Sequence, residues 1–119
     1  MIIKPLENKD GIIIEGLLLI EPEIFKDSRG FFYESWNQKK FNNIIGKETK
    51  FVQDNKSFSS KGVLRGLHYQ KNPFAQGKLL SCDFGEIYDV AVDIRKGSPT
   101  FGTWTYAYLT SKNKNQLWI

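Results

Sequence analysis

The sequence has only one cysteine, Cys82, and one histidine, His68. A disulfide within the chain and a cysteine-based zinc site each need a second cysteine, so both are excluded. A single histidine also excludes the usual metal centres that are built from several histidines, and the carboxylates show no spacing typical of a metal site. We therefore expect any catalysis to proceed without a metal.

Long apolar runs and blocks of like charge are also missing. No run approaches the roughly 20 apolar residues that cross a bilayer, and residues 1–9 lack the basic start and cleavage site of a signal peptide. The net charge of +4 comes from 17 Lys and Arg against 13 Asp and Glu without clustering. We therefore expect a cytoplasmic protein that binds neither membrane nor nucleic acid. The small positive excess suits a site for an anionic small molecule or a merely basic surface.

The length and composition describe one globular domain, residues 1–119, with 40% hydrophobic and 25% charged residues. Glycine-rich phosphate loops, nucleophile elbows and Cys-His pairs are absent, which disfavours nucleoside triphosphate and acyl transfer chemistry. Proton transfer or plain ligand binding are the functions left open.

Short runs rich in β-branched and aromatic residues, separated by turn residues, predict an all-β sandwich or barrel. The expected strands cover 12–14, 17–20, 31–36, 51–58, 63–70, 78–84, 86–95, 104–109 and 116–119. We expect hairpins to join 51–58 to 63–70 and 78–84 to 86–95. One short helix is predicted over Gln38 to Ile45, capped by Asn37 and ended by Gly46. Because an apolar strand-like run ends the sequence, we expect that further residues or a partner chain complete the sheet.

His68 lies among apolar residues on a predicted strand, where a lone histidine is usually a packed core residue. Its neighbours favour chemistry instead. Strict alternation would send Arg65 and His68 to opposite faces, but a bulge at Gly66 would return both to one side. Lys78 begins the next strand, where a hairpin would bring its ammonium beside the imidazole. An imidazole that takes a proton and a cation that stabilises an enolate oxygen suit proton abstraction beside a carbonyl.

Other polar residues form an inventory suited to a phosphorylated, hydroxyl-rich ligand. Arg29 and Glu34 flank a pair of phenylalanines, while Gln53 and Asn55 point to the same face of their predicted strand. Each alone is explained equally by a turn, a solvated surface or an edge amide. Together they supply a bidentate cation, an acceptor and amide donors.

Two aspartates and the aromatic residues leave alternatives open. Asp89 and Asp93 share a strand face, and one of them could orient His68 through its other ring nitrogen. The three Trp, five Tyr and nine Phe residues could add a stacking surface for a base, although core packing explains them as well.

Several consecutive motifs closely resemble the dTDP-4-dehydrorhamnose 3,5-epimerase family, in the same order and spacing from about residue 16 onward. They occupy 27–32 with Glu34, 51–55, 63–70, 76–78, 89–95, 98–102 and 116–119. The resemblance implies a cupin-type β jelly roll that pairs as a homodimer through exchanged strands. It also implies an enzyme that uses neither a metal nor an organic cofactor.

The resemblance further implies roles for individual residues. His68 would be the base that removes protons beside the C4 ketone of dTDP-4-dehydro-6-deoxy-D-glucose, and Lys78 would stabilise the enolate. The residues expected to contact the nucleotide diphosphate and sugar are Arg29, Glu34, Gln53, Asp54, Asn55, Arg65 and Lys78. Among these, Arg65 would clamp the pyrophosphate.

In the family, an aspartate that pairs with the base, a tyrosine that reprotonates the opposite face and a second histidine follow the motif matched by residues 116–119. We therefore expect a jelly roll that is incomplete at its C-terminal end, either because the sequence ends early or because a shortened product is a remnant. The expected function is epimerisation at C3 and C5 to dTDP-4-dehydro-L-rhamnose. The alternatives are a single-carbon epimerase or ketoisomerase of dTDP-4-keto sugars and a non-catalytic sugar-nucleotide-binding remnant.

Overall fold

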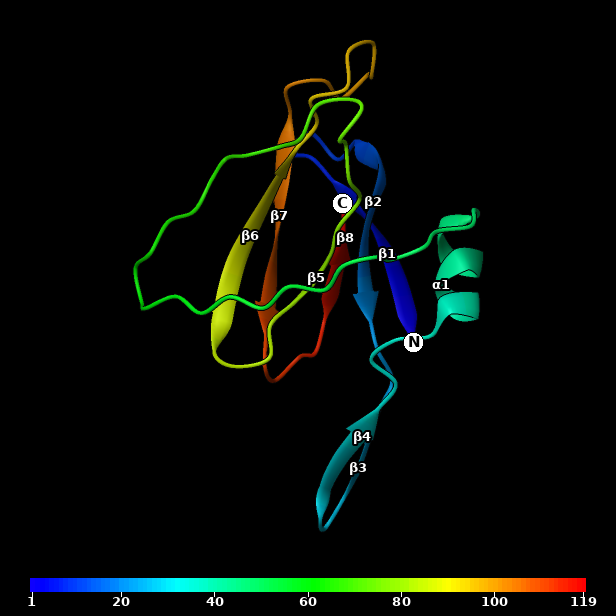
Figure 1. Ribbon diagram of the computed structural model, residues 1–119, viewed down its shortest axis with the longest axis vertical. Coiled ribbons are helices and arrows are strands. Elements are labelled where there is room, and N and C mark those ends of the chain that lie inside the picture. The colour runs from blue at the N-terminus through cyan, green and yellow to red at the C-terminus, as the bar shows by residue number, and fades with distance from the viewer.

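The computed structural model describes residues 1–119 as strands arranged in antiparallel sheets, with one short helix. The elements are β1 (Ile2–Glu7), β2 (Ile13–Glu21), β3 (Ile24–Asp27), β4 (Gly30–Tyr33), α1 (Gln38–Ile45), β5 (Leu79–Ser81), β6 (Glu86–Val92), β7 (Trp104–Thr110) and β8 (Gln116–Trp118). The expected all-β class with one helix is confirmed (Figure 1). The eight-residue helix is too short to cross a membrane.

Two sheets enclose the main core. Strands β1, β2, β8 and β5 form one sheet in that order, and β6 pairs with β7 in another. Alternate residues of facing strands point inward, as the period of a strand requires. Their apolar side chains form one buried cluster of Ile14, Leu17, Ala91, Ala107, Leu109 and Leu117. The buried face of β6 is therefore the face of Asp89 and Ala91, which lie opposite Ala107 and Thr105 of β7.

The ribbon of β3 and β4 projects away from the two sheets (Figure 1). Its strands pair Phe25 with Phe32 and Lys26 with Phe31. All three phenylalanines are exposed, and neither strand contributes a residue to the buried clusters. At the tip, the Asp27 carboxylate accepts a hydrogen bond from the backbone N–H of Arg29 at 2.8 Å and so closes the turn.

The helix forms over the residues that the sequence predicts. The Asn37 side chain accepts a hydrogen bond from the Lys40 N–H at 3.0 Å, and Gly46 ends the helix with a φ of 67°. Phe41 is the buried residue of the helix. It joins Trp36, Phe51 and Trp118 in tilted and edge-to-face ring contacts with centroids 4.9 to 6.1 Å apart. We call these four residues the aromatic cluster.

The predicted strands 51–58 and 63–70 are wrong, because both segments are irregular. Only the turn of the expected hairpin forms, where the Val63 N–H donates to the Ser60 carbonyl at 3.3 Å. Val52 and Leu64 remain 85% and 91% exposed, so the alternating apolar residues find no strand or face to pack against. Such a pattern predicts which side of a strand is apolar, but not whether a neighbouring strand is present.

The expected pairing of 78–84 with 86–95 is also wrong, because β5 pairs with β8 and β6 with β7. The predicted segments 12–14 and 17–20 fall, except for Ile12, within one strand, β2, which continues through Gly16 at a φ of 83°. Strand β1 and strand β3 were not predicted. Where strands were predicted, local residue patterns identified extended chain but not the strand that pairs with it.

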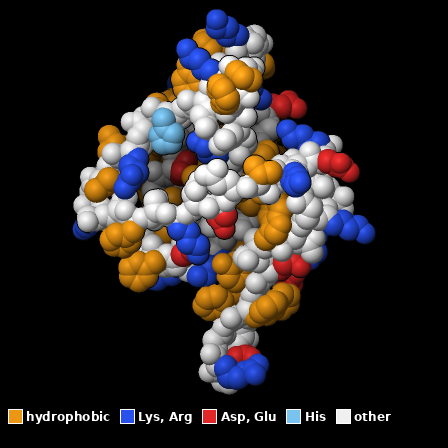
Figure 2. Space-filling model, in the orientation of Figure 1, with side chains coloured by type: hydrophobic (Ala, Val, Ile, Leu, Met, Phe, Trp, Pro, Cys, Tyr) orange, Lys and Arg blue, Asp and Glu red, His pale blue; other side chains and the backbone are white.

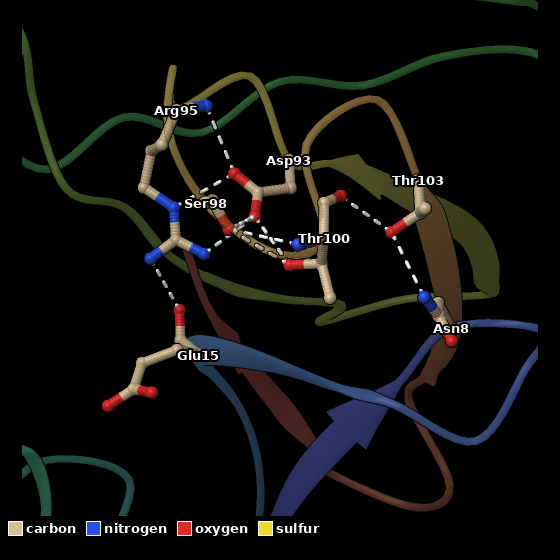
Figure 3. A network of polar contacts seen from close by, with 7 residues as sticks. All are labelled: Asn8, Glu15, Asp93, Arg95, Ser98, Thr100 and Thr103. Atoms are coloured by element: carbon tan, nitrogen blue, oxygen red, sulfur yellow. Dashed lines mark hydrogen bonds and ion pairs between the residues drawn. The ribbon is translucent and has the colours of Figure 1, made fainter.

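A polar network joins the loop after β6 to β2 (Figure 3). The fully buried Asp93 carboxylate accepts hydrogen bonds from Arg95, Ser98 and Thr100. Arg95 also donates to the Glu15 carbonyl at 2.7 Å. The Arg95 guanidinium and the two hydroxyl donors hold the pKa of Asp93 far below its usual range.

Candidate functional site

His68 is open to solvent, so the alternative of a packed core histidine does not hold. Figure 2 shows the single histidine of the chain in pale blue at the rim of a hollow in which an acidic group is visible. Its ring lies against the backbone of Gly66, where a methyl group would be only 3.1 Å from His68 Nδ1. Gly66 has a φ of 104°, a value that side chains disfavour. The irregular backbone predicted there is present, but as coil and not as a bulge within a strand.

Asp89 brings His68 and Lys78 into one site. Its half-buried carboxyl lies on the inward face of β6. Burial raises the pKa of Asp89, and the nearby charges of His68 and Lys78 partly oppose that rise. The imidazole, the ammonium and the carboxylate therefore interact electrostatically, although no hairpin joins the segments that carry His68 and Lys78.

Lys78 is held by its backbone. Its N–H donates to the Ile119 carbonyl at 2.8 Å, and the Ile119 N–H donates back to the Lys78 carbonyl at 2.9 Å. This reciprocal pair extends the ladder between β5 and β8 by one residue at the point where the chain enters the site. The half-buried side chain of Lys78 therefore starts from a well-defined backbone position.

The structure separates the two aspartates that the sequence could not distinguish. The Asp93 carboxylate is occupied by Arg95, Ser98 and Thr100, whereas Asp89 lies near His68 and Lys78. Alternation along 86–95 puts Asp89 and Asp93 on one face, opposite the more apolar one, and the structure turns the face of the aspartates inward. The sequence offered both aspartates as partners of His68, and the half-buried Asp89 is the one that interacts with it.

The amides of the 51–58 segment lie together, as predicted. Gln53 Nε2 donates to Asn55 Oδ1 at 3.0 Å, and both side chains are exposed. Asp54, between them, adds an exposed carboxylate whose charge is felt by Lys56. An ion pair of 2.9 Å between Lys56 and Asp83 ties this segment to the turn that follows β5.

Arg65 folds back onto its own segment. Its Nε donates to Ser59 Oγ at 3.0 Å, across the turn that joins 51–58 to 63–70. The side chain is exposed, so its remaining guanidinium donors are accessible to an anion.

Arg29 and Glu34 lie elsewhere in this chain. Arg29 sits at the tip of the projecting ribbon and pairs with Asp27 at 2.6 Å, which lowers the pKa of the Asp27 carboxyl. Glu34 accepts from Lys40 at 2.8 Å and from Asn37 at 3.1 Å beside the start of α1, and these bonds lower its pKa. The structure therefore gathers His68, Lys78 and Asp89 but does not bring Arg29 and Glu34 to them within one chain.

The site offers a base, a cation and an acid whose charges act on one another. An imidazole can accept a proton from an acidic C–H bond, and an ammonium nearby can stabilise the oxyanion that results. No group of three or more His, Cys, Asp or Glu side chains is arranged to hold a metal ion.

Comparison with known proteins gives one consistent family. Residues 12–119 match the family model described as dTDP-4-dehydrorhamnose 3,5-epimerase. The enzyme of that name from Shigella flexneri is 60% identical over 106 residues, which cover 89% of this chain and 59% of the relative. The chain thus spans less than two thirds of the length of this curated relative.

Solved structures agree. The Legionella pneumophila epimerase in complex with dTDP-4-keto-L-rhamnose is 51% identical, with a TM-score of 0.85 over 98% of this chain and 60% of its own. A 3'-monoepimerase from Streptomyces bikiniensis in complex with dTDP-quinovose is 34% identical, with a TM-score of 0.84 over 97% and 55% of the two chains. The fold is therefore the expected cupin-type jelly roll. By sequence and by fold, the chain belongs to the dTDP-4-dehydrorhamnose 3,5-epimerase family.

Proposed function

We propose that this protein epimerises dTDP-4-dehydro-6-deoxy-D-glucose at C3 and C5 to give dTDP-4-dehydro-L-rhamnose, a step in dTDP-L-rhamnose biosynthesis. The observation that carries the proposal is that the charges of His68 and Lys78 both act on the half-buried Asp89 in a chain of this family. A cytoplasmic location stays a prediction from the sequence.

In this proposal His68 is the base. Both C3 and C5 are adjacent to the C4 ketone, so removal of either proton gives an enolate whose negative charge rests on the C4 oxygen. The Lys78 ammonium would stabilise that oxygen, and the Asp89 carboxylate would interact with the charges of both groups. No step needs a metal or an organic cofactor.

Binding of the nucleotide part would involve the exposed polar groups around this site. Gln53, Asp54 and Asn55 offer amide and carboxylate groups to sugar or base hydroxyl and N–H groups. Arg65 would clamp the pyrophosphate with its exposed guanidinium. Its bond to Ser59 leaves the guanidinium exposed, which supports this role.

We propose that Arg29 and Glu34 act in a homodimer formed through exchanged strands, in which the β3–β4 ribbon of one protomer reaches the site of its partner. The projection of the ribbon and its exposed Phe25, Phe31 and Phe32 support this arrangement, because apolar side chains on a free ribbon favour a covering partner.

Mixing an Arg29→Ala protein with a His68→Asn protein tests the exchange of ribbons between protomers. The mixture should regain about a quarter of wild-type activity, because about half of the dimers are mixed and each mixed dimer has one of its two sites intact. Two inactive variants that stay inactive after subunit exchange would contradict the arrangement.

Solvent deuterium incorporation into dTDP-4-dehydro-6-deoxy-D-glucose tests the reaction. Exchange at C3 and C5 supports the proposal. Exchange at one carbon alone would favour a single-carbon epimerase or ketoisomerase. The structural similarity to a 3'-monoepimerase supports this alternative. Binding of dTDP without exchange would favour a non-catalytic sugar-nucleotide-binding protein.

Two variants separate the proposed roles. His68→Asn should abolish deuterium exchange with little change in dTDP affinity, and retained exchange would refute the base assignment. Arg65→Ala should mainly weaken dTDP binding, and normal affinity would show that the pyrophosphate binds elsewhere.

A further inference from the structure

Gly77 differs from every other glycine in the chain. Nine of the ten glycines have a positive φ, which explains why a glycine occupies each of those positions. Gly77 has no such φ, and it is instead packed against the indole of Trp118. A methyl group on Gly77 would lie 3.0 Å from Trp118 Cζ3 and 3.2 Å from Cζ2, and closer still to Cη2. Space, and not backbone conformation, therefore requires glycine at this position.

Trp118 cannot easily give way to such a methyl group. It is only 8% exposed, and its ring packs edge-on against Phe41 at 5.2 Å and Phe51 at 6.1 Å. A closely packed protein interior transmits strain to its neighbours and does not absorb it. A side chain at position 77 would therefore displace the 76–78 backbone rather than the indole.

That backbone leads directly to the proposed enolate-stabilising amine. Residue 78 follows Gly77, and it is joined to Ile119 by the two reciprocal hydrogen bonds of 2.8 and 2.9 Å. Ile119 follows Trp118 in the same way. The Gly77 contact and the Lys78 pair thus join the same two segments, 77–78 and 118–119, at adjacent residues.

The aromatic cluster also connects the other segments that carry predicted site residues. Trp36 follows Glu34 by two positions, and Phe51 precedes Gln53 by two. Trp36 contacts Phe51 edge-on with a centroid distance of 4.9 Å. Trp36 and Phe51, which lie two residues from Glu34 and Gln53, therefore belong to the same aromatic cluster as the Trp118 ring that contacts Gly77.

We propose that Gly77 and Trp118 are positioning residues for Lys78, and that their close contact sets where its ammonium meets the enolate oxygen. This inference rests on the proposed function for the role of the amine. The placement of the Lys78 backbone can be tested without assuming that function.

A double-mutant cycle of Gly77→Ala and Trp118→Phe tests the contact, because phenylalanine lacks the outer indole atoms that the new methyl group would meet. Gly77→Ala should lower kcat for deuterium exchange by about 10-fold to 100-fold, with KM changed far less. In the Trp118→Phe background the same change should cost less than about twofold. Gln76→Ala, at the exposed neighbouring position, serves as the matched control and should leave kcat unchanged.

Amide hydrogen exchange supplies the second measurement. Gly77→Ala should speed exchange of the Lys78 and Ile119 N–H groups, and the double variant should match Trp118→Phe alone. Wild-type kcat and protection in Gly77→Ala, or an equal loss in both backgrounds, would overturn the proposal. If the wild-type protein exchanges no sugar protons, the proposed function fails, while the amide measurement still decides whether the contact places Lys78. If the Gly77→Ala protein does not fold, the double variant with Trp118→Phe is the test. It should fold, and failure to fold would overturn the proposal.

Discussion

The facing sheets and the 51–77 segment have similar sequence patterns but different structures. Both contain short apolar runs that are typical of strands, yet Leu117 in β8 is fully buried while Leu64 in the segment is 91% exposed. In the sheets, each strand has hydrogen-bonded neighbours and an opposing face. The segment has neither within the chain. The difference teaches that a period of two marks the apolar side of a strand, whereas burial depends on a partner elsewhere.

The largest expected effect separates these two regions directly. Leu117→Ala should lower the free energy of unfolding by about 2–5 kcal/mol, because it leaves a cavity in a closed core. Leu64→Ala should change it by no more than about 0.5 kcal/mol, because an exposed side chain loses little packing. Urea unfolding of both variants measures this contrast. Equal losses would show that the 51–77 segment is packed in solution.

The Asp93 network should account for the next largest effect. Asp93→Asn should cost about 1.5–3 kcal/mol, because an amide cannot accept all the bonds now made to the buried carboxylate. The network also predicts a pH dependence. Because the folded pKa of Asp93 lies below its unfolded value of about 3.9, its contribution is fully present well above that pH and is lost as the pH falls through and below it.

Urea midpoints of the wild type and Asp93→Asn, measured from neutral pH down to about pH 3, test this sign. The difference between the two proteins should shrink on acidification. Asp10→Asn, at an exposed surface position, is the control and should follow the wild type. A difference that grew at low pH would contradict the assignment of the lowered pKa.

A smaller effect is expected at the helix, which both regions adjoin. Asn37→Ala should cost about 1 kcal/mol, because the Lys40 N–H would lose its acceptor at the start of α1. Asn43→Ala, at an exposed position within the same helix, should leave the unfolding free energy almost unchanged. Circular dichroism during urea unfolding provides the comparison, and equal behaviour of the two variants would argue against capping.

The smallest effect concerns the ion pair between Lys56 and Asp83, which ties the segment to the sheets. Each partner shifts the pKa of the other in the direction of an ion pair, but both side chains are exposed. Lys56→Met should therefore leave global unfolding unchanged and only speed proteolysis within 51–58 at low salt. The difference from wild type should vanish near 1 M salt, where screening acts within about 3 Å. A difference that persists there would indicate packing by the lysine stem.

Local features of the sequence predicted local features of the structure. The helix was predicted to the residue, because Asn37, Gly46 and the apolar face of Phe41 all act within its own span. Alternation along 86–95 predicted which residues of β6 share a face, but not that the face of Asp89 and Ala91 is the inward one. Pairing was mostly missed, because β5 joins β8 across more than thirty residues and no local pattern encodes that choice.

In the site, too, contacts between distant segments were harder to predict than local features. The meeting of His68 and Lys78 was expected through a hairpin, but the structure achieves it through Asp89 on a third segment. The separation of Arg29 from His68 was not foreseen, because spacing along a chain carries no information about a ribbon that leaves the sheets. The contact of Gly77 with Trp118 could not be read from residue types at all.

The β3–β4 ribbon has a consequence for how such a protein can change over generations. Since none of its residues belongs to the buried clusters, substitutions there leave the scaffold as stable as before. The arginine at its tip can therefore be exchanged, or the ribbon lengthened, without repacking the interior. Natural selection can thus change the contacts that the ribbon makes while the residues around the His68 imidazole stay unchanged.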